Sequence, residues 1–353
     1  MVNSKYVHCC PAWTAGPRQT HPKFGGGIIV GGIGRVEDRL VAIHQAFPDD
    51  FSSGHNYLEV RLDGDEYEVC NKPEAISCER LYEGIKEKVF PKWSAFTSPA
   101  FALPGIEDGA ILNENPYIVA RARVGHLTAI TRSREFRRKN IGLGHTIWWP
   151  ARDSRLHRGP LSKMGVEEAW ERLFNFWVDV AQKIKKPDDD SFTMLLEYKP
   201  SVPGDLDFIP TMKAAIKFCI ELNKRVGWKF MGINLEWAHA LIGGQTVEEA
   251  TRQQLAAGLF GGLVHVNSAQ LAMIRWDSPG RAILEGTPGD DSDWAVGEGG
   301  KERWNDQLAA VKLLLGSGIF ITFEHDIDPS GEDSMACYAR SRGNLEKMIQ
   351  AVA

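Results

Sequence analysis

The sequence predicts a single (β/α)8 barrel over residues 1–353, with long loops at 10–34 and 268–302. Two observations carry this prediction. Short apolar runs alternate with amphipathic helical segments along the chain, and side chains able to bind metals follow the ends of several of these runs. A length of 353 residues agrees with this fold class, because α/β barrels commonly reach that size as one domain.

Eight segments have the composition of strands. The last four are continuous apolar runs rather than alternating ones, as expected for parallel strands that are buried on both faces. The third contains a proline, so we expect a short or irregular strand there. The expected strands are residues 4–10, 56–62, 93–103, 145–149, 192–198, 229–236, 261–266 and 319–325.

Helical segments separate these strands. The clearest is 166–184, where apolar residues recur at spacings of three and four. Ser77 is an expected N-cap of one helix, and Thr246 with Glu249 forms the capping box of another. The expected helices are residues 37–47, 77–90, 116–138, 166–184, 208–226, 246–259, 302–318 and 335–352. A doubly wound open sheet is the alternative architecture, but the glycine-rich stretch 25–34 does not match the phosphate-binding turn of that fold.

The composition excludes some function classes. A net charge of −5 with mixed signs gives no basic face for nucleic acid, and no run of 18 apolar residues predicts a membrane span. Six cysteines without a CxxC spacing indicate free thiols in a reducing compartment, so we expect a cytoplasmic protein. The adjacent Cys9 and Cys10 are interpreted as packing residues at a strand end.

Side chains that can bind a metal end each of the last four expected strands. They are Glu197 and Lys199 in LLEYKP, Glu236 and His239 in NLEWAH, His265 and Asn267 in LVHVN, and Glu324, His325 and Asp326 in TFEHD. The C-terminal strand ends of a barrel meet at one face, where gathered carboxylates repel one another unless a cation neutralises them. Three carboxylates and one imidazole suit an octahedral divalent ion, with Mn²⁺ expected and Mg²⁺ or Co²⁺ as alternatives.

Strand alternation divides the residues of TFEHD further. His325 should point away from the barrel interior, whereas Asp326 points inward with Glu324 and is the alternative ligand. From the residues alone, His239 either contacts substrate or orients Glu236, and His145 is either a base or a hydrogen-bonded core histidine.

The order ExKP, ExxH, HxN and FE resembles the xylose isomerase-like barrels, which include sugar isomerases and ketose epimerases. The segment DSDWAVGEG at 291–299 is similar to a loop motif of xylose isomerase. The resemblance implies a metal held by Glu197, Glu236, His265 and Glu324, with Lys199 and His239 near the substrate. Asp291 and Asp293 match second-metal carboxylates of xylose isomerase, but the aspartate that xylose isomerase has at the position of Asn267 is missing.

Three segments, GHTIWWPARDS, EYKPSVPGDLDF and NLEWAHALIGG, are most similar to the large subunit of bacterial C-glycoside deglycosidases. This resemblance implies a small β-sandwich partner subunit in a hetero-oligomer, and a sugar substrate with a flat aromatic aglycone. It implies His145 as the base. The residues expected to bind substrate are Trp148, Trp149, Arg152, Asn267 and Asp293, with Trp276 and Trp294 as further aromatic walls.

A divalent ion at a barrel mouth can chelate two sugar oxygens and stabilise an enolate, while a base takes the proton next to the carbonyl. The resemblance implies that this step cleaves the carbon–carbon bond between the sugar and the aglycone of a 3-oxo-C-glycoside, and O-glycosides are a further substrate class. The alternative is a metal-dependent sugar isomerase or ketose 3-epimerase that acts without a partner. A third hypothesis, a sugar-binding subunit without chemistry, does not explain the intact set of four ligands.

Overall fold

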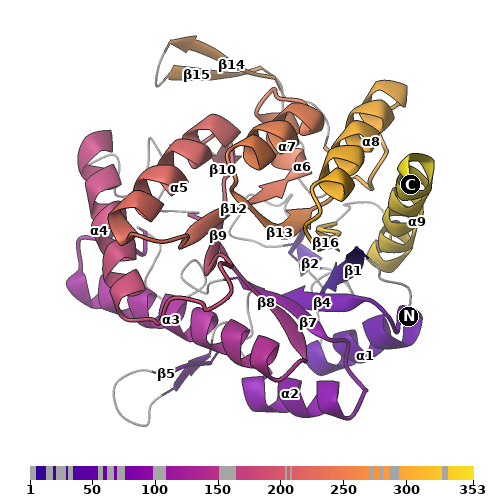
Figure 1. Cartoon of the computed structure of the whole chain (residues 1–353), viewed down its shortest axis with the longest axis horizontal. Helices are drawn as coiled ribbons and strands as arrows, with labels where there is room; N and C mark the ends of the chain where they lie inside the picture. Colours follow the sequence, from indigo (N-terminus) through magenta and orange to yellow (C-terminus); the bar gives the residue numbers. More distant parts are fainter. Residues whose placement is uncertain are drawn as a thin grey trace. The chain divides into compact units, whose positions relative to one another are not determined.

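Eight parallel strands close into a barrel in the order β1, β16, β13, β12, β9, β8, β7 and β4 (Figure 1). This computed structural model describes residues 5–12, 19–20, 29–30, 35–54, 59–61, 67–69, 76–97, 109–150, 164–202, 205–206, 209–269, 273–278, 281–285, 294–327 and 333–353. The barrel strands are β1 (Tyr6–Pro11), β4 (Phe51–Gly54), β7 (Trp93–Thr97), β8 (Gly142–Trp148), β9 (Met194–Glu197), β12 (Met231–Glu236), β13 (Phe260–His265) and β16 (Ile321–Glu324). The predicted barrel is therefore confirmed.

Helices follow the strands along the chain, as predicted. They are α1 (Val36–Ala46), α2 (Cys78–Lys86), α3 (Pro116–Arg138), α4 (Val166–Gln182), α5 (Met212–Val226), α6 (Trp237–Ile242), α7 (Val247–Ala256), α8 (Lys301–Gly316) and α9 (Ser334–Val352). Ser77 caps α2 by accepting a hydrogen bond from the Arg80 amide, and Thr246 caps α7 by accepting one from the Glu249 amide. No helix in the described part of the chain is long and apolar enough to cross a membrane.

The second barrel strand differs from the prediction. A strand does lie within the expected range 56–62, at β5 (Glu59–Arg61), but it is not a barrel strand: it pairs with β6 (Tyr67–Val69) in a separate two-stranded sheet. The barrel position is taken by β4, whose sequence FSSG pairs with β1. Three further two-stranded sheets fall in loops, formed by β2 (Gln19–Thr20) with β3 (Ile29–Val30), β10 (Ser201–Val202) with β11 (Asp205–Leu206), and β14 (Met273–Ser278) with β15 (Arg281–Glu285).

The chain forms two compact units, one made of residues 1–53 and 234–353 and the other of 54–233. The second unit has an aromatic core between β8 and helices α4 and α5. The Trp148 ring lies 4.8 Å from Trp177 of α4 and 5.7 Å from Phe218 of α5, and Phe218 stacks on Phe174 at 5.0 Å. Aromatic pairs at these separations add to the stabilisation from burial of their large apolar surfaces.

This packing corrects the prediction that Trp148 lines a substrate pocket. Its side chain is 1% exposed and faces the helices. Because neighbouring strand residues point to opposite faces, Ile147 and Trp149 take the interior face instead. Trp148 is therefore a core residue that holds α4 and α5 against β8.

In the first unit, a polar network joins β1 and β16 to α9. His325 approaches Ser341 of α9 at 2.9 Å through Nδ1 and His8 of β1 at 3.0 Å through Nε2. The other ring nitrogen of His8 lies 2.7 Å from Glu346 of α9. His325 thus points away from the barrel interior, as strand alternation predicts, while the preceding Glu324 points into it.

Candidate metal centre

Three buried ligand side chains of the first unit stand at the last residues of three barrel strands. Glu236 ends β12, His265 ends β13 and Glu324 ends β16. Each has an exposed fraction of 3% or less. These strands are buried along almost their whole length, so their last residues place the polar groups in a desolvated site. Carboxylates in such a site need hydrogen bonds, a cation or protons to balance their charge.

The His265 imidazole lies among three carboxylates. Its Nε2 is 3.6 Å from Oε1 of Glu324, and its Nδ1 is 3.7 Å from Oε2 of Glu236 and 3.8 Å from Oδ2 of Asp326. These separations exceed hydrogen-bond lengths but suit ligands that surround one ion. The ligand atoms of Glu236, His265 and Asp326 all lie within 4.8 Å of one another and form one group able to hold a metal.

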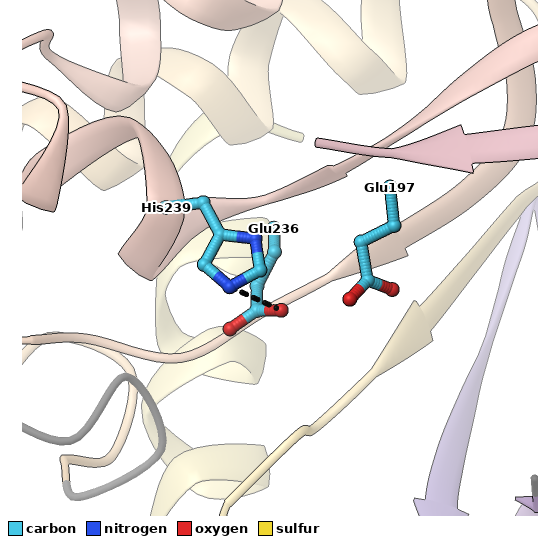
Figure 2. Close-up of side chains that lie close together, drawn as sticks. All are labelled: Glu197, Glu236 and His239. Atoms are coloured by element: carbon cyan, nitrogen blue, oxygen red, sulfur yellow. Dashed lines mark ion pairs between the residues drawn. The ribbon is translucent and has the colours of Figure 1, made fainter. Parts of the chain in front are cut away.

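A second group able to hold a metal consists of Glu197, Glu236 and His239 (Figure 2). Glu197 is the last residue of β9, and His239 lies on the short helix α6, which starts directly after Glu236. The His239 Nε2 atom is 3.2 Å from Oε2 of Glu236. Because residues three apart on a helix share a face, the Glu-x-x-His spacing turns His239 back toward the carboxylate.

Both carboxylate oxygens of Glu324 have donors on neighbouring strands. The Ser53 hydroxyl of β4 donates to Oε1 at 2.6 Å, and the Cys9 thiol of β1 donates to Oε2 at 3.8 Å. Burial raises the pKa of the Glu324 carboxyl, and the nearby His265 and the two donors act against that rise. No sequence pattern indicated a role for Ser53, and Cys9 was expected only as a packing residue.

Asn267 is fully buried, and its amide is engaged inside the protein. Its Nδ2 donates to Oε1 of Glu236 at 2.9 Å and to the Asp326 carbonyl at 3.1 Å, and its Oδ1 accepts from the Ala238 amide at 2.9 Å. The prediction that Asn267 contacts substrate is therefore corrected: it holds a predicted ligand and the first turn of α6. Gln307 of α8 donates a 2.9 Å hydrogen bond to the backbone carbonyl of Asn267 and so helps to fix Asn267 in place.

The donor set fits a divalent cation. Carboxylate oxygens and one imidazole are ligands of hard and borderline ions, and the ligands come from rigid strand ends. The Asn267 amide fixes one ligand from outside, and the Ser53 hydroxyl fixes another. Such hydrogen bonds to the ligands are typical of functional metal sites.

The register of β8 and β9 places His145 away from the strand ends. Ile147 pairs with Leu195, so Trp149 stands level with Glu197 and His145 lies four residues earlier, about 13 Å along the strand. Thr146 donates to Ser133 of α3, so His145 faces the interior at this lower level. Burial and the Arg137 guanidinium lower the pKa of His145 to about 4. This placement argues against His145 as the base at the metal.

Lys199 and Trp149, both predicted site residues, lie close together. The Lys199 ammonium lies 5.4 Å from the centroid of the Trp149 ring, a cation–π arrangement at the ends of β8 and β9. Arg152, Asp291 and Asp293 lie outside the described residues, as does the side chain of Trp276. Trp294 is described, and its backbone carbonyl accepts a 2.9 Å hydrogen bond from Ser268.

No protein-family model matches this sequence, and no curated protein matches it. Solved structures do. An L-ribulose 3-epimerase has a TM-score of 0.60 and 14% identity over 98% of this chain and 95% of its own. A 3-keto-D-glucoside 4-epimerase from E. coli has a TM-score of 0.55 and 12% identity over 98% of both chains.

A third structure is a xylose isomerase-like TIM barrel protein from Mycobacterium smegmatis in complex with magnesium. Its TM-score is 0.51, with 14% identity over 98% of both chains. At this level of identity the likeness establishes the fold, which is that of xylose isomerase-like TIM barrels.

Proposed function

We propose that this chain is a metal-dependent enzyme that moves a proton at the carbon next to a sugar carbonyl, as sugar isomerases and epimerases do. The observation that carries the proposal is the convergence of three carboxylates on the buried His265 at 3.6 to 3.8 Å, two of which, those of Glu236 and Glu324, are themselves buried. Gathering these charges away from water is costly, and a protein that kept the fold without the chemistry would gain nothing from it.

Glu197, Glu236, His265 and Glu324 would hold the ion, with Asp326 as the alternative fourth carboxylate. When bound, a divalent metal supplies a Lewis acid that polarises a carbonyl and stabilises the enolate. We expect Mn²⁺, with Mg²⁺ and Co²⁺ as alternatives. Among the solved structures, one magnesium-bound barrel of the same fold supports a divalent ion in general.

The chain's own residues would orient the sugar and shelter the reaction. His239, held against Glu236, would bind a sugar hydroxyl and fix the substrate relative to the ligands. Lys199, placed over Trp149, would bind a second oxygen at the same end of the barrel. Two proteins of the same fold, an L-ribulose 3-epimerase and a 3-keto-D-glucoside 4-epimerase, support sugar proton transfer over other chemistry.

A second candidate is the carbon–carbon lyase reaction on 3-oxo-C-glycosides, with a small β-sandwich partner. In that reaction a base removes the C2 proton, the bond from C1 to the aglycone breaks, and a proton is delivered to the aglycone carbon. Two observations favour it: the likeness of three sequence segments to C-glycoside deglycosidases, and a fold neighbour that acts on a keto-glucoside. The depth of His145 counts against it, because the expected base stands far below the strand ends.

Incubation of the metal-loaded protein in D₂O with a ketohexose, and separately with a 3-oxo-C-glycoside, tests both functions. The isomerase or epimerase proposal predicts a new sugar isomer and deuterium at the reacting carbon, seen by NMR, without a partner chain. Release of aglycone without ketose turnover would replace it with the lyase function. No turnover of the ketohexose would contradict the isomerase or epimerase proposal, and no aglycone release in the presence of the small partner subunit would contradict the lyase.

The metal centre is tested by Glu236→Gln. We expect this variant to lose its metal on dialysis, measured by elemental analysis, while Glu171→Gln on the surface of α4 retains it. Stoichiometric metal in Glu236→Gln would remove Glu236 from the ligand set.

A further inference from the structure

We infer that Ser53 and Cys9 are positioning residues that orient Glu324 toward the metal and raise the affinity of the site for it. The inference rests on the proposed metal centre and adds two residues to it. Neither contacts the ion in this proposal, and both act through the carboxylate of Glu324.

The geometry comes from three neighbouring strands. Strand β1 lies between β16 and β4, and Cys9 stands opposite Glu324 in the parallel register. Ser53 on β4 pairs with Pro11 of β1, two residues above Cys9. The two donors therefore approach Glu324 from one side of the barrel, while His265 on β13 approaches from the other.

The contacts divide the two carboxylate oxygens between the donors. Oε1 accepts the Ser53 hydroxyl at 2.6 Å and lies 3.6 Å from Nε2 of His265, while Oε2 accepts the Cys9 thiol at 3.8 Å. A carboxylate with a donor on each oxygen cannot turn about its last side-chain bond without losing one of them. Its orientation is thus set before an ion arrives, which lowers the cost of binding one.

The chain provides matched controls at the next residues. Ser52, also buried, donates its hydroxyl to the Cys10 carbonyl at 2.9 Å, away from Glu324. Cys10 packs with Ile43 and Tyr338 on the outer side of the strand. Each inward residue therefore has an outward neighbour of the same type, with similar burial and no contact to the ligand.

The test is Mn²⁺ affinity, measured by competition with a fluorescent chelator on the full-length protein. We expect Ser53→Ala to weaken binding roughly 10- to 100-fold, the range seen when groups that hold metal ligands are removed. Cys9→Ala should weaken it less, because a thiol is a weaker donor. Ser52→Ala and Cys10→Ala should stay within about twofold of the wild type, and Ser53→Thr, which keeps the hydroxyl, should restore most of the affinity.

Urea denaturation of each metal-free variant separates positioning from general destabilisation. If Ser53→Ala does not fold, Cys9→Ala carries the test, with Cys10→Ala as its control and a weaker Mn²⁺ affinity expected only for Cys9→Ala. Equal Mn²⁺ affinities for Ser53→Ala and Ser52→Ala would overturn the inference while the metal centre stood. A wild-type protein that binds no divalent metal would overturn the metal centre and the inference with it.

Discussion

Asn267 donates a 2.9 Å hydrogen bond to Oε1 of Glu236 and accepts one of 2.9 Å from the Ala238 amide through the same side chain. One amide group thereby fixes the last residue of β12 and the start of α6, the helix that carries His239. Asn267 therefore holds the end of β12 and the first turn of α6 in a fixed arrangement. The distance between His239 and Glu236 depends on these two hydrogen bonds.

Asn267→Ala should disturb both residues together. Loss of the amide leaves the Ala238 N–H without its acceptor and removes the donor to Oε1 of Glu236 in a buried site, so we expect about 1–3 kcal/mol lower stability and weaker metal binding. Urea denaturation and Mn²⁺ titration measure the two effects. Asn344→Ala is the control for metal affinity, because it removes an amide that donates to the Val296 carbonyl and accepts from Lys347, away from the ligands. Unchanged affinity in Asn267→Ala would show that Glu236 needs no such support.

His239→Gln should separate substrate contact from metal binding. We expect the metal to stay near one equivalent in this variant, because Glu236 and His265 remain, while kcat/KM for the sugar falls by 10²-fold or more as the contact is lost. Elemental analysis and steady-state kinetics give the two values. Metal loss comparable to that of Glu236→Gln would instead make His239 a ligand, as its place in one of the two candidate groups allows.

Trp148→Ala should destabilise the protein without touching the site. Removing a buried indole from the cluster with Trp177 and Phe218 costs about 3–5 kcal/mol. Thermal or urea unfolding should show this loss, and Trp148→Phe should show a smaller one. A variant with normal stability and weakened substrate binding would show that Trp148 contacts the substrate, as first predicted.

His126 of α3 should make the second unit sensitive to acid. Its ring lies 4.6 Å from Trp177 and 5.5 Å from Phe176, and burial lowers its pKa from 6.5 to about 3. The unfolded chain therefore binds a proton between pH 6.5 and 3 that the folded chain does not, so stability falls as the pH drops through this window.

The size of this effect can be measured with His126→Gln, which stays neutral throughout. We expect the wild type to lose about 2 kcal/mol more stability than the variant between pH 7.5 and pH 5, as chemical denaturation at each pH would show. Parallel pH profiles for the two proteins would mean that His126 is protonated in the folded state.

The main elements of the barrel could be predicted because their signals are local. Strands β12, β13 and β16 are apolar runs, and each ligand is the last residue of its run. Two elements lacked such a signal. Strand β4 has the sequence FSSG, and its strand conformation comes from pairing with β1 rather than from its own residues. Helix α6 is buried throughout its six residues, so it reads as a continuation of the apolar strand.

The contacts that support the site could not be predicted, because they depend on the register between strands that are distant in sequence. Ser53 and Glu324 are 271 residues apart, and Asn267 and Glu236 are 31 apart. Alternation along one strand indicates which residues face inward, but it does not indicate which inward residues of different strands are in contact. The same limit explains His145: its inward face agrees with the sequence, while its depth appears only from the pairing of β8 with β9.

The pairing of β1 with β16 also has a consequence for the order of events during synthesis. Cys9 is synthesised 315 residues before Glu324, its partner across the strands. At translation rates of about 5–20 residues per second, β1 waits on the order of tens of seconds for β16. Through this interval β1 has an unsatisfied edge, the kind of surface that chaperones cover, so the nascent chain should depend on them more than the finished protein does.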